Sequence, residues 1–361
     1  MSTRDGSVDV DIDERTIGET PLLALDVDVP ATVYGKAEWF NLYATGYGGG
    51  SIKSRIAKGM LDAAEARGEL AAGMTVVEST SGNTGSELAR VAGARGYDVE
   101  IVMPEDASAG KIGAVRDAGA EIHFVDPELG YDAVLDRCES IVASDPDRYY
   151  HPNQYENPDN PGTHERTTAA EIWSQTDGAV THFVAGAGTG GTVTGVGRGL
   201  TARGDVTVVG FEPAAKPHAI DGLKYLRSGE AYHPGTYDES VVDRLEYVAT
   251  EDAHARARAL YDRYRDREVT VVDRGQHDPE TVAEHLRVGG KFVVGPSSGG
   301  ALQAVHQLAA DDALHADDVI VITLCDRGDK YANSPPWESY LNLDLDSGSD
   351  SGSDHAADGD G

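Results

Sequence analysis

A lysine that follows a run of glycines is the residue with the clearest chemical potential in this sequence. Residues 48 to 55 read Gly-Gly-Gly-Ser-Ile-Lys-Ser-Arg, and a helix-like pattern follows from Ile56 to Ala66. Glycines let the backbone approach a bound group closely. The field of a helix N-terminus and partial burial both favour the neutral amine of Lys53, the form that attacks carbonyl groups. The alternative is a solvated lysine after a flexible loop.

Three further loops of small residues, at 80–85, 186–192 and 295–300, follow strand-like runs at Thr75–Glu78, Thr181–Ala185 and Phe292–Val294. Ligands of open α/β sheets collect at the carboxyl ends of strands, and a helix N-terminus offers unpaired N–H groups to an anion. A structural turn could account for any one of these loops. Four loops rich in Ser, Thr and Asn instead predict one site that binds an anionic ligand from several directions.

The loop at 186–192 has a second interpretation. Gly186, Gly188 and Gly191 satisfy the G-x-G-x-x-G pattern after a strand. Glu212 lies at the end of the next predicted strand, as a dinucleotide-binding fold requires. The two threonines of the loop, however, add hydroxyl donors that suit a terminal phosphate. An NAD-dependent dehydrogenase would also leave Lys53 and the loop at 80–85 without a role, and we keep it as the alternative from a different class.

Strand and helix patterns alternate from Thr75 to Cys325 in this chain of 361 residues. This alternation is typical of α/β proteins with mostly parallel sheets, and the length is enough for two domains. A stretch rich in Pro, Asn, Asp and Tyr at 145–165 is the expected boundary. The last predicted strand is Val319–Leu324. Two cysteines exclude a disulfide framework, the twelve histidines show no metal-ligand spacing, and we predict no metal.

The charge balance is extreme, with 62 acidic against 30 basic residues and a formal net charge of −32. Such a surface repels nucleic acids and anionic membranes, so we predict neither as a partner. At molar salt the Debye length falls to about 3 Å, which screens this repulsion and indicates a halophilic protein. Because no apolar run could span a membrane and no signal peptide is evident, we expect a cytoplasmic location. Residues 1–16 are predicted to be a flexible acidic arm and 343–361 a disordered acidic tail.

From about Ile17 to Tyr331 the chain resembles the cysteine synthase branch of the fold type II pyridoxal-phosphate enzymes. The resemblance rests on ordered motifs at 50–55, 80–85, 103–105 (Met-Pro-Glu), 154–158 (Gln-Tyr-Glu-Asn-Pro), 188–192, 297–299 and 325–331 (Cys-Asp-Arg-Gly-Asp-Lys-Tyr). The last motif is closest to that of the B-type synthases. The resemblance implies two open, twisted, mostly parallel-sheet domains similar to those of the tryptophan synthase β-subunit, at 17–155 and 156–342, with 20–38 packing against the second. It also implies a homodimer.

The resemblance further implies roles for individual residues. Lys53 would hold pyridoxal 5'-phosphate as an internal aldimine and later move the substrate's α proton. Asn83 would bind the hydroxyl of the pyridine ring, and Ser297 would face the ring nitrogen. The cofactor phosphate would be bound by Gly188, Thr189, Gly190, Gly191 and Thr192, and the substrate by Thr80, Ser81, Gly82, Thr84, Gln154 and Gly222.

The implied reaction is β-replacement. An activated serine, with O-acetylserine first among the candidates, loses its leaving group to give an enzyme-bound aminoacrylate, and sulfide then adds to make L-cysteine. A neutral hydroxyl from Ser297 does not keep the ring nitrogen protonated, which favours prompt loss of the β substituent. Cystathionine β-synthase and O-phosphoserine sulfhydrylase are the nearest alternatives. A dehydratase fits the threonines of the phosphate loop less well, and a non-catalytic scaffold is disfavoured by the intact Lys53 and Asn83. Serine acetyltransferase is a candidate protein partner.

The sequence departs from the family's pattern at three places. Ten positions separate Asn41 from Ser51, so we expect a lengthened entrance loop. Ser54 stands where an aspartate is common. Lys224 lies in a segment near the substrate where many members are apolar, and it is either a surface lysine or a contact for an anionic leaving group or sulfur donor such as thiosulfate. Cys325 is predicted to be a small packed residue rather than a nucleophile.

Overall fold

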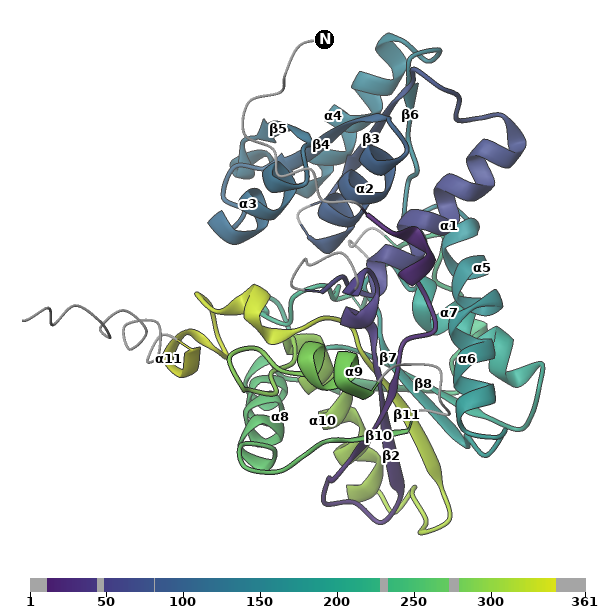
Figure 1. Ribbon diagram of the computed structural model, residues 1–361, viewed down its shortest axis with the longest axis vertical. Helices are drawn as coiled ribbons and strands as arrows, with labels where there is room; N and C mark the ends of the chain where they lie inside the picture. Colours follow the sequence, from purple (N-terminus) through teal and green to yellow (C-terminus); the bar gives the residue numbers. More distant parts are fainter. Residues whose placement is uncertain (1–11, 44–48, 81, 228–232, 273–278, 342–361) are drawn as a thin grey trace, which may run out of the picture.

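A computed structural model describes residues 12–43, 49–80, 82–227, 233–272 and 279–341. Two α/β units, each built around its own sheet, lie one above the other in Figure 1. The predicted fold class, α/β with mostly parallel sheets, is confirmed. The predicted acidic tail lies outside the described residues, as does most of the predicted arm. The arm's last residues form a short 3₁₀ helix, η1 (Glu14–Thr16), whose Glu14 carboxylate pairs with Arg95.

The larger sheet has seven strands in the order β10-β1-β2-β11-β7-β8-β9. The strand β1 pairs antiparallel with both of its neighbours, whereas all pairs from β2 to β9 are parallel. Residues 22–37 therefore join a sheet whose other strands come from residues 182–324. In sheet order the bounds are β10 (Thr270–Val272), β1 (Leu22–Leu25), β2 (Thr32–Ala37), β11 (Val319–Leu324), β7 (His182–Gly186), β8 (Thr207–Pro213) and β9 (Arg244–Val248).

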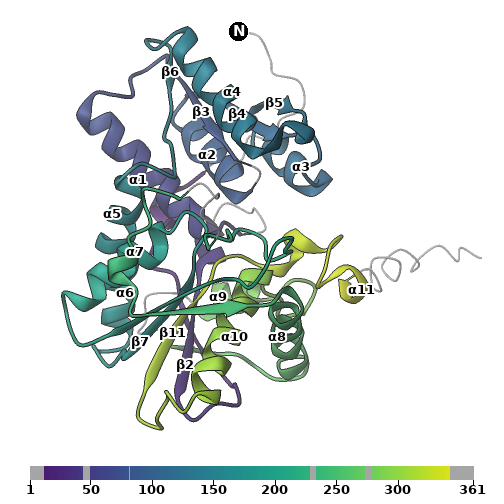
Figure 2. The same ribbon diagram turned by 180° about the vertical axis from the view of Figure 1, so that it is seen from behind.

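The smaller sheet has four parallel strands in the order β5-β4-β3-β6. Its bounds are β5 (Glu121–Val125), β4 (Asp98–Pro104), β3 (Thr75–Ser79) and β6 (Tyr149–Tyr150). The chain leaves the larger unit along α1 (Ile52–Arg67), builds this sheet with α2 (Asn83–Ala94), α3 (Ala109–Asp117) and α4 (Gly130–Ser144), and then returns. Figure 2 shows from behind that α1 runs between the two units.

The larger sheet is buried on both faces, which is why its central strands are almost continuously apolar. In β11, Ile320, Ile322 and Leu324 point into one apolar cluster, and Val321 between them points into another. This alternation follows from the two-residue period of a strand. The remaining helices are α5 (Asp159–Arg166), α6 (Thr168–Gln175), α7 (Gly191–Thr201), α8 (Thr250–Arg263), α9 (Pro279–Leu286), α10 (Pro296–Ala310) and α11 (Glu338–Leu341).

One predicted strand is wrong. Residues 292–294 are buried as a strand would be, but they form no ladder, and only an isolated bridge joins Val294 to Arg327. The turn before them uses Gly289 and Gly290 at positive φ, and α10 begins at Pro296. The apolar side chains of residues 292–294 instead pack into the core cluster that α8, α9 and α10 share. The loop at 295–300 is thus the first turns of α10 itself.

A cluster of four charges, of which Lys36, Glu38 and Arg55 are buried and Glu171 is partly buried, fixes α1 to the larger unit. Arg55 in the second turn of α1 bonds Glu38 at 2.6 Å and Glu171 of α6 at 2.7 Å. Lys36 of β2 lies 2.7 Å from the same Glu171. Two cations and two anions balance in this cluster, so burial leaves no net charge there. Arg55 follows Lys53 by two positions on the same helix, so the cluster also fixes the position of the Lys53 backbone.

Candidate functional site

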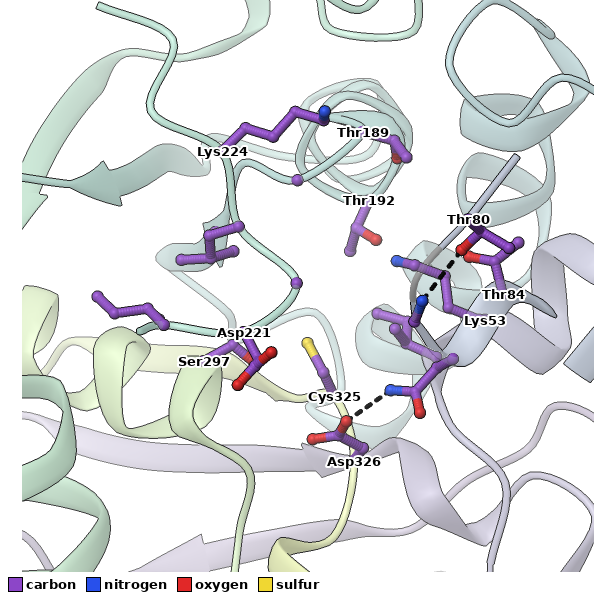
Figure 3. A pocket seen from close by; sticks show the side chains of 18 of the residues that line it. Lys53, Thr80, Thr84, Thr189, Thr192, Asp221, Lys224, Ser297, Cys325 and Asp326 are labelled. Atoms are coloured by element: carbon purple, nitrogen blue, oxygen red, sulfur yellow. Dashed lines mark hydrogen bonds between the residues drawn. The ribbon is translucent and has the colours of Figure 1, made fainter. Parts of the chain in front are cut away.

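A pocket of about 330 Å³ is lined by residues of both units, near the carboxyl ends of β3, β7 and β11. Its size is within the range of small-molecule sites. Its lining combines Lys53, the loop after β3, the loop after β7 and the start of α10 (Figure 3). The loops that the sequence analysis singled out therefore meet at one place.

Lys53 projects into this pocket from the first turn of α1 (Figure 3). Ser51 caps the helix by accepting a hydrogen bond from the Lys53 amide at 3.2 Å, and Ser54 completes a capping box. The helix begins at Ile52, four residues earlier than the sequence predicted. Burial lowers the pKa of the Lys53 amine, against the opposing effects of Cys325, Asp326 and Glu38. The amine is thus disposed to be neutral and nucleophilic.

The loop between β7 and α7 forms a cradle for an anion. Gly190 has φ +80° and precedes α7 without a side chain of its own to cap the helix. The first N–H of α7, that of Gly191, donates to Thr189 Oγ1 at 3.3 Å, and the N–H groups that follow it point to where a helix N-terminus binds an anion. A Cβ at Gly188 would lie 2.1 Å from the Gly222 carbonyl oxygen, and one at Gly190 would lie 2.3 Å from Tyr237. Glycine is therefore required at both positions, and Gly222 meets the loop through its carbonyl group.

The hydroxyl groups of this loop are held from behind by α5. Asn160 donates to Thr189 Oγ1 at 3.1 Å, and the His164 ring lies 3.2 Å from Thr192 Oγ1. Burial, with Arg55 and Lys53 acting in the same sense, lowers the pKa of His164 well below its ordinary value, so the ring is neutral. Sequence reasoning missed both supports, because the segment at 145–165 reads only as turns.

The segment after β3 contacts Gln154 at the pocket. Thr84 Oγ1 donates to Gln154 Oε1 at 2.7 Å, and Thr80 Oγ1 accepts from the Gly82 amide at 3.2 Å. Gly82 is the N-cap of α2, again without a side-chain cap. These hydroxyl and N–H groups are suited to a substrate carboxylate. Ser81, predicted to belong to the same set, lies outside the described residues.

Asn83 and Ser297 line the pocket near Lys53. Asn83 opens α2, and its Nδ2 donates to Asp326 Oδ2 at 2.6 Å. Figure 3 marks this bond by the dashed line that ends at Asp326. Ser297 is in the first turn of α10 with 8% of its surface exposed. Cys325 also lines the pocket, where burial raises the pKa of its thiol and so disfavours the thiolate.

Lys224 is another pocket residue. Its backbone N–H donates to the Ala187 carbonyl at 2.9 Å, and its ammonium lies 4.6 Å from the centre of the Tyr155 ring. Burial and the neighbouring Lys216 lower the pKa of Lys224, while Asp132 opposes them. Lys224 thus lines the pocket, where burial disfavours its charged form, and its role as a contact for an anion stays a prediction.

Two contacts at the pocket were not expected from the sequence. Lys111 of α3 pairs with Asp221 at 2.5 Å and so joins the smaller unit to the segment before Gly222. Asp326, quoted only as part of a motif, bonds both Asn83 and Tyr331. Among the described residues, no group of three or more His, Cys, Asp and Glu side chains could hold a metal ion. No helix within the described ranges is long and apolar enough to cross a membrane.

The dinucleotide interpretation does not fit this geometry. The Glu212 carboxylate is 3% exposed and accepts a hydrogen bond from the Leu226 amide at 2.6 Å. It therefore holds the segment after Gly222 instead of being open to a ribose. A Cβ at Gly186 would meet Leu223 of that segment at 2.5 Å, so this glycine serves packing.

The site fits pyridoxal phosphate. Lys53 offers an amine to an aldehyde, the loop at 188–192 offers N–H and hydroxyl donors to a phosphate, and Asn83 and Ser297 offer polar groups between them. A pocket of this kind between two α/β units defines an enzyme of the fold type II pyridoxal-phosphate class. The sequence profile described as "Pyridoxal-phosphate dependent enzyme" matches residues 14–326. The chain belongs to this family of pyridoxal-phosphate-dependent enzymes.

The most similar relatives include cysteine synthases. The chain is 37% identical over 325 residues to a cysteine synthase from Aquifex aeolicus, covering 88% of this chain and 89% of that protein. It is 35% identical over 322 residues to cysteine synthase B from Escherichia coli, covering 89% and 94%. The resemblance inferred from the motifs is thereby confirmed, and the dehydrogenase alternative is not supported.

Solved structures of other proteins have the same fold as this chain. An O-ureido-L-serine synthase superposes with a TM-score of 0.73 at 31% identity, covering 94% of this chain and 96% of that one. A cysteine synthase from Entamoeba histolytica superposes with a TM-score of 0.72 at 28% identity, covering 98% and 95%. The names of these two proteins state different products, so the fold alone does not decide which product this chain makes.

Proposed function

We propose that this protein is a pyridoxal-phosphate-dependent cysteine synthase that replaces the β substituent of an activated serine with sulfide. The observation that supports the proposal most strongly is the Lys53 amine, whose pKa is lowered by burial, in one pocket with the glycine- and threonine-rich helix start at 188–192. The cysteine synthases among the relatives supply the substrate class. When bound, pyridoxal phosphate would supply the electron sink that lets the α proton and the β substituent leave.

The pocket residues divide between the cofactor and the substrate. Lys53 attaches the cofactor and carries the α proton of the substrate. The loop Gly188, Thr189, Gly190, Gly191 and Thr192 holds the phosphate, Asn83 the ring hydroxyl and Ser297 the ring nitrogen. The substrate carboxylate lies against Thr80, Gly82, Thr84 and Gln154, with Ser81 as a further candidate, and Gly222 borders the β substituent.

We further propose a two-domain, halophilic and cytoplasmic enzyme. The two sheets correspond to domains at 17–155 and 156–342, with residues 20–38 as part of the second, and the site lies between them. The net charge of −32 supports a halophilic, cytoplasmic enzyme. We propose a homodimer and an association with serine acetyltransferase on the family's pattern alone. Size determination by light scattering at molar KCl tests the dimer, for which a monomer at assay concentrations is the contrary result.

The test of the function is cysteine formation by the protein loaded with pyridoxal phosphate at molar KCl. O-acetylserine with sulfide should give L-cysteine, and Lys53→Ala should abolish it. A strong preference for homocysteine over sulfide as the nucleophile would identify a cystathionine β-synthase instead. Failure to release cysteine from any activated serine would overturn the proposal.

Lys224 favours one variant of this function, in which the substituent on the serine is an anion such as the phosphate of O-phosphoserine. Its ammonium lies in the pocket against Tyr155, and Lys216 adds positive charge nearby. In a partly desolvated site, one charge-assisted contact contributes roughly 1.5–3 kcal/mol, or about 10- to 100-fold in rate. The Lys224 ammonium could bind thiosulfate, an anionic sulfur donor, through the same kind of charge-assisted contact.

Paired kinetics separate these substrates. Lys224→Ala should lower kcat/KM for O-phosphoserine or thiosulfate by at least about 10-fold and leave O-acetylserine with sulfide within about twofold. Lys58→Ala, which removes one positive charge paired with Asp62 outside this pocket, is the matched control. Equal losses for charged and neutral substrates would show that Lys224 does not select an anion.

A further inference from the structure

Both ends of the Asn83 amide are held by residues of the other unit. Asn83 Nδ2 donates to Asp326 Oδ2 at 2.6 Å, and Lys330 Nζ donates to Asn83 Oδ1 at 3.3 Å. Asp326 follows β11, and Lys330 lies in the 3₁₀ helix η6 (Gly328–Tyr331), whereas Asn83 opens α2 beside the smaller sheet. The contacts therefore span 243 and 247 positions of the chain.

These two partners leave the amide a single orientation. An ammonium group can only donate hydrogen bonds, so Lys330 fixes the carbonyl end of the amide. Burial raises the pKa of Asp326, but its Oδ2 also accepts from the Tyr331 hydroxyl and so acts as an acceptor towards Asn83. Rotating the amide by half a turn would set its NH₂ group against Lys330 and its carbonyl oxygen against Asp326. With the amide as it stands, one of the two Nδ2 hydrogens is used by Asp326, and the other is left to donate to an acceptor in the pocket that Asn83 lines.

Asp326 is itself held in place. Tyr331 donates to Asp326 Oδ2 at 2.6 Å, and only 2% of the Asp326 surface is exposed. A Cβ at Gly295 would lie 1.9 Å from Asp326 Oδ1, so a glycine at that position leaves room for the carboxylate. Asp326 Oδ1 is buried and accepts no hydrogen bond from the residues that the structure describes. The carboxylate is thus placed at a cost in desolvation, which indicates a purpose beyond packing.

Lys330 also contacts the segment that precedes Lys53. Its Nζ also donates to the Gly50 carbonyl at 3.0 Å and lies 3.7 Å from Glu87 of α2. Glu87 in turn accepts from Ser54 in the capping box of α1 at 2.7 Å. One ammonium group therefore ties the segment after β11 to the start of α1 and to α2, the helices that carry Lys53 and Asn83.

We propose that Asp326 and Lys330 are positioning residues that lock the Asn83 amide so that its remaining N–H points at the hydroxyl oxygen of the pyridine ring. The inference rests on the proposed function, because it names a group of pyridoxal phosphate as the acceptor. A locked donor loses no rotational freedom when the ligand binds, so the contact contributes its full free energy to binding. Neither residue needs to touch the reacting atoms for this purpose.

A double-mutant cycle on cofactor affinity tests the proposal. The full-length protein, freed of cofactor, is titrated with pyridoxal phosphate for wild type, Asn83→Ala, Asp326→Ala and the double variant. Each single change should raise the dissociation constant about 10-fold, as expected for one lost hydrogen bond to a charged group. Because Asp326 acts through Asn83, the double variant should bind no more weakly than Asn83→Ala. Multiplying losses in the double variant would overturn the proposal.

Further variants separate this role from a structural one. Asp329→Asn changes an acid of the same segment that pairs with Arg327, and it should stay within about twofold of wild type. If Asp326→Ala does not fold, Lys330→Met with Asn83→Ala forms a second cycle with the same expected non-additivity, and multiplying losses there overturn the proposal equally. If wild type itself does not bind pyridoxal phosphate, the proposed function fails. If it binds and the cycle is additive, only the positioning role fails.

Discussion

Neutralising Glu171 should destabilise the protein strongly. Its carboxylate lies 2.7 Å from both Lys36 and Arg55, whose side chains are 0% and 1% exposed. Glu171→Gln leaves these two cations facing Glu38 alone, so one buried positive charge becomes uncompensated. Breaking a buried pair in this way costs about 3–5 kcal/mol, a large part of a total stability of about 5–15 kcal/mol. Urea denaturation at constant molar KCl measures the loss.

The pH dependence provides a second measure of the same cluster. Burial alone would raise the pKa of Glu171, but Lys36 and Arg55 together hold it well below its usual range. A carboxyl group with a depressed folded-state pKa contributes stability above its unfolded pKa of about 4.3 and loses it as the pH falls. Wild type should therefore lose stability on acidification below about pH 5, and Glu171→Gln should lose less.

The matched control is Asp262→Asn, the same acid-to-amide change in an ion pair with Arg265 whose side chains are 53% and 57% exposed. An exposed pair contributes at most about 1 kcal/mol. If Glu171→Gln costs no more than Asp262→Asn, the cluster does not hold α1 by charge balance, and the reasoning is refuted.

Three more results are expected. As the pH rises, the rate at which the cofactor-free protein attaches pyridoxal phosphate should become constant before pH 10.5, because burial lowers the pKa of Lys53. A rate that still increases through pH 10.5 would contradict this. Gly190→Ala should weaken cofactor binding at least about 10-fold, because Gly190 has a positive φ and an added Cβ would meet Tyr237. Gly73→Ala is the control, since Gly73 also has a positive φ but has open space around it, and it should leave the affinity unchanged. Equal affinities of the two variants in a titration would refute the role of the 188–192 loop as the phosphate cradle. Ser297→Asp should shift the visible spectrum of the bound cofactor and lower turnover, and an unchanged spectrum and kcat would show that Ser297 is not the partner of the ring.

The parts of the site that the sequence predicts are those whose chemistry and backbone requirement lie in one short motif. Lys53 follows a glycine run and lies in the first turn of a helix, and Gly188 to Thr192 combine small residues with hydroxyl groups at a helix start. Such motifs carry their own geometry, because a helix N-terminus presents its N–H groups wherever it is placed. The structure adds that these motifs share one pocket.

Contacts between distant segments could not be predicted in this way. Lys111 and Asp221 are 110 positions apart, and nothing in either segment indicates a partner. Asp326 meets Asn83 only because β11 lies beside β2, which leads towards α1 and the smaller unit. A sequence pattern states which residues are buried or polar, but pairing across sheets depends on the whole topology.

The fold, too, has parts that the local sequence predicts and one part that it does not. The alternation of strands and helices predicts parallel sheets, and the central strands are found where their apolar runs lie. The predicted strand at 292–294 is wrong because its apolar character reflects burial under α8 to α10 and not pairing. Short apolar runs are ambiguous in this respect, since burial and strand pairing leave the same signal.

The central claim is that Lys53 binds pyridoxal phosphate covalently, and the intact mass of the protein after borohydride reduction tests it most directly. Wild type incubated with pyridoxal phosphate at molar KCl should gain the mass of one reduced cofactor, located on the peptide that contains Lys53. Lys53→Ala should gain none. A wild-type protein that gains no mass, or that carries the adduct on another lysine, would contradict the account.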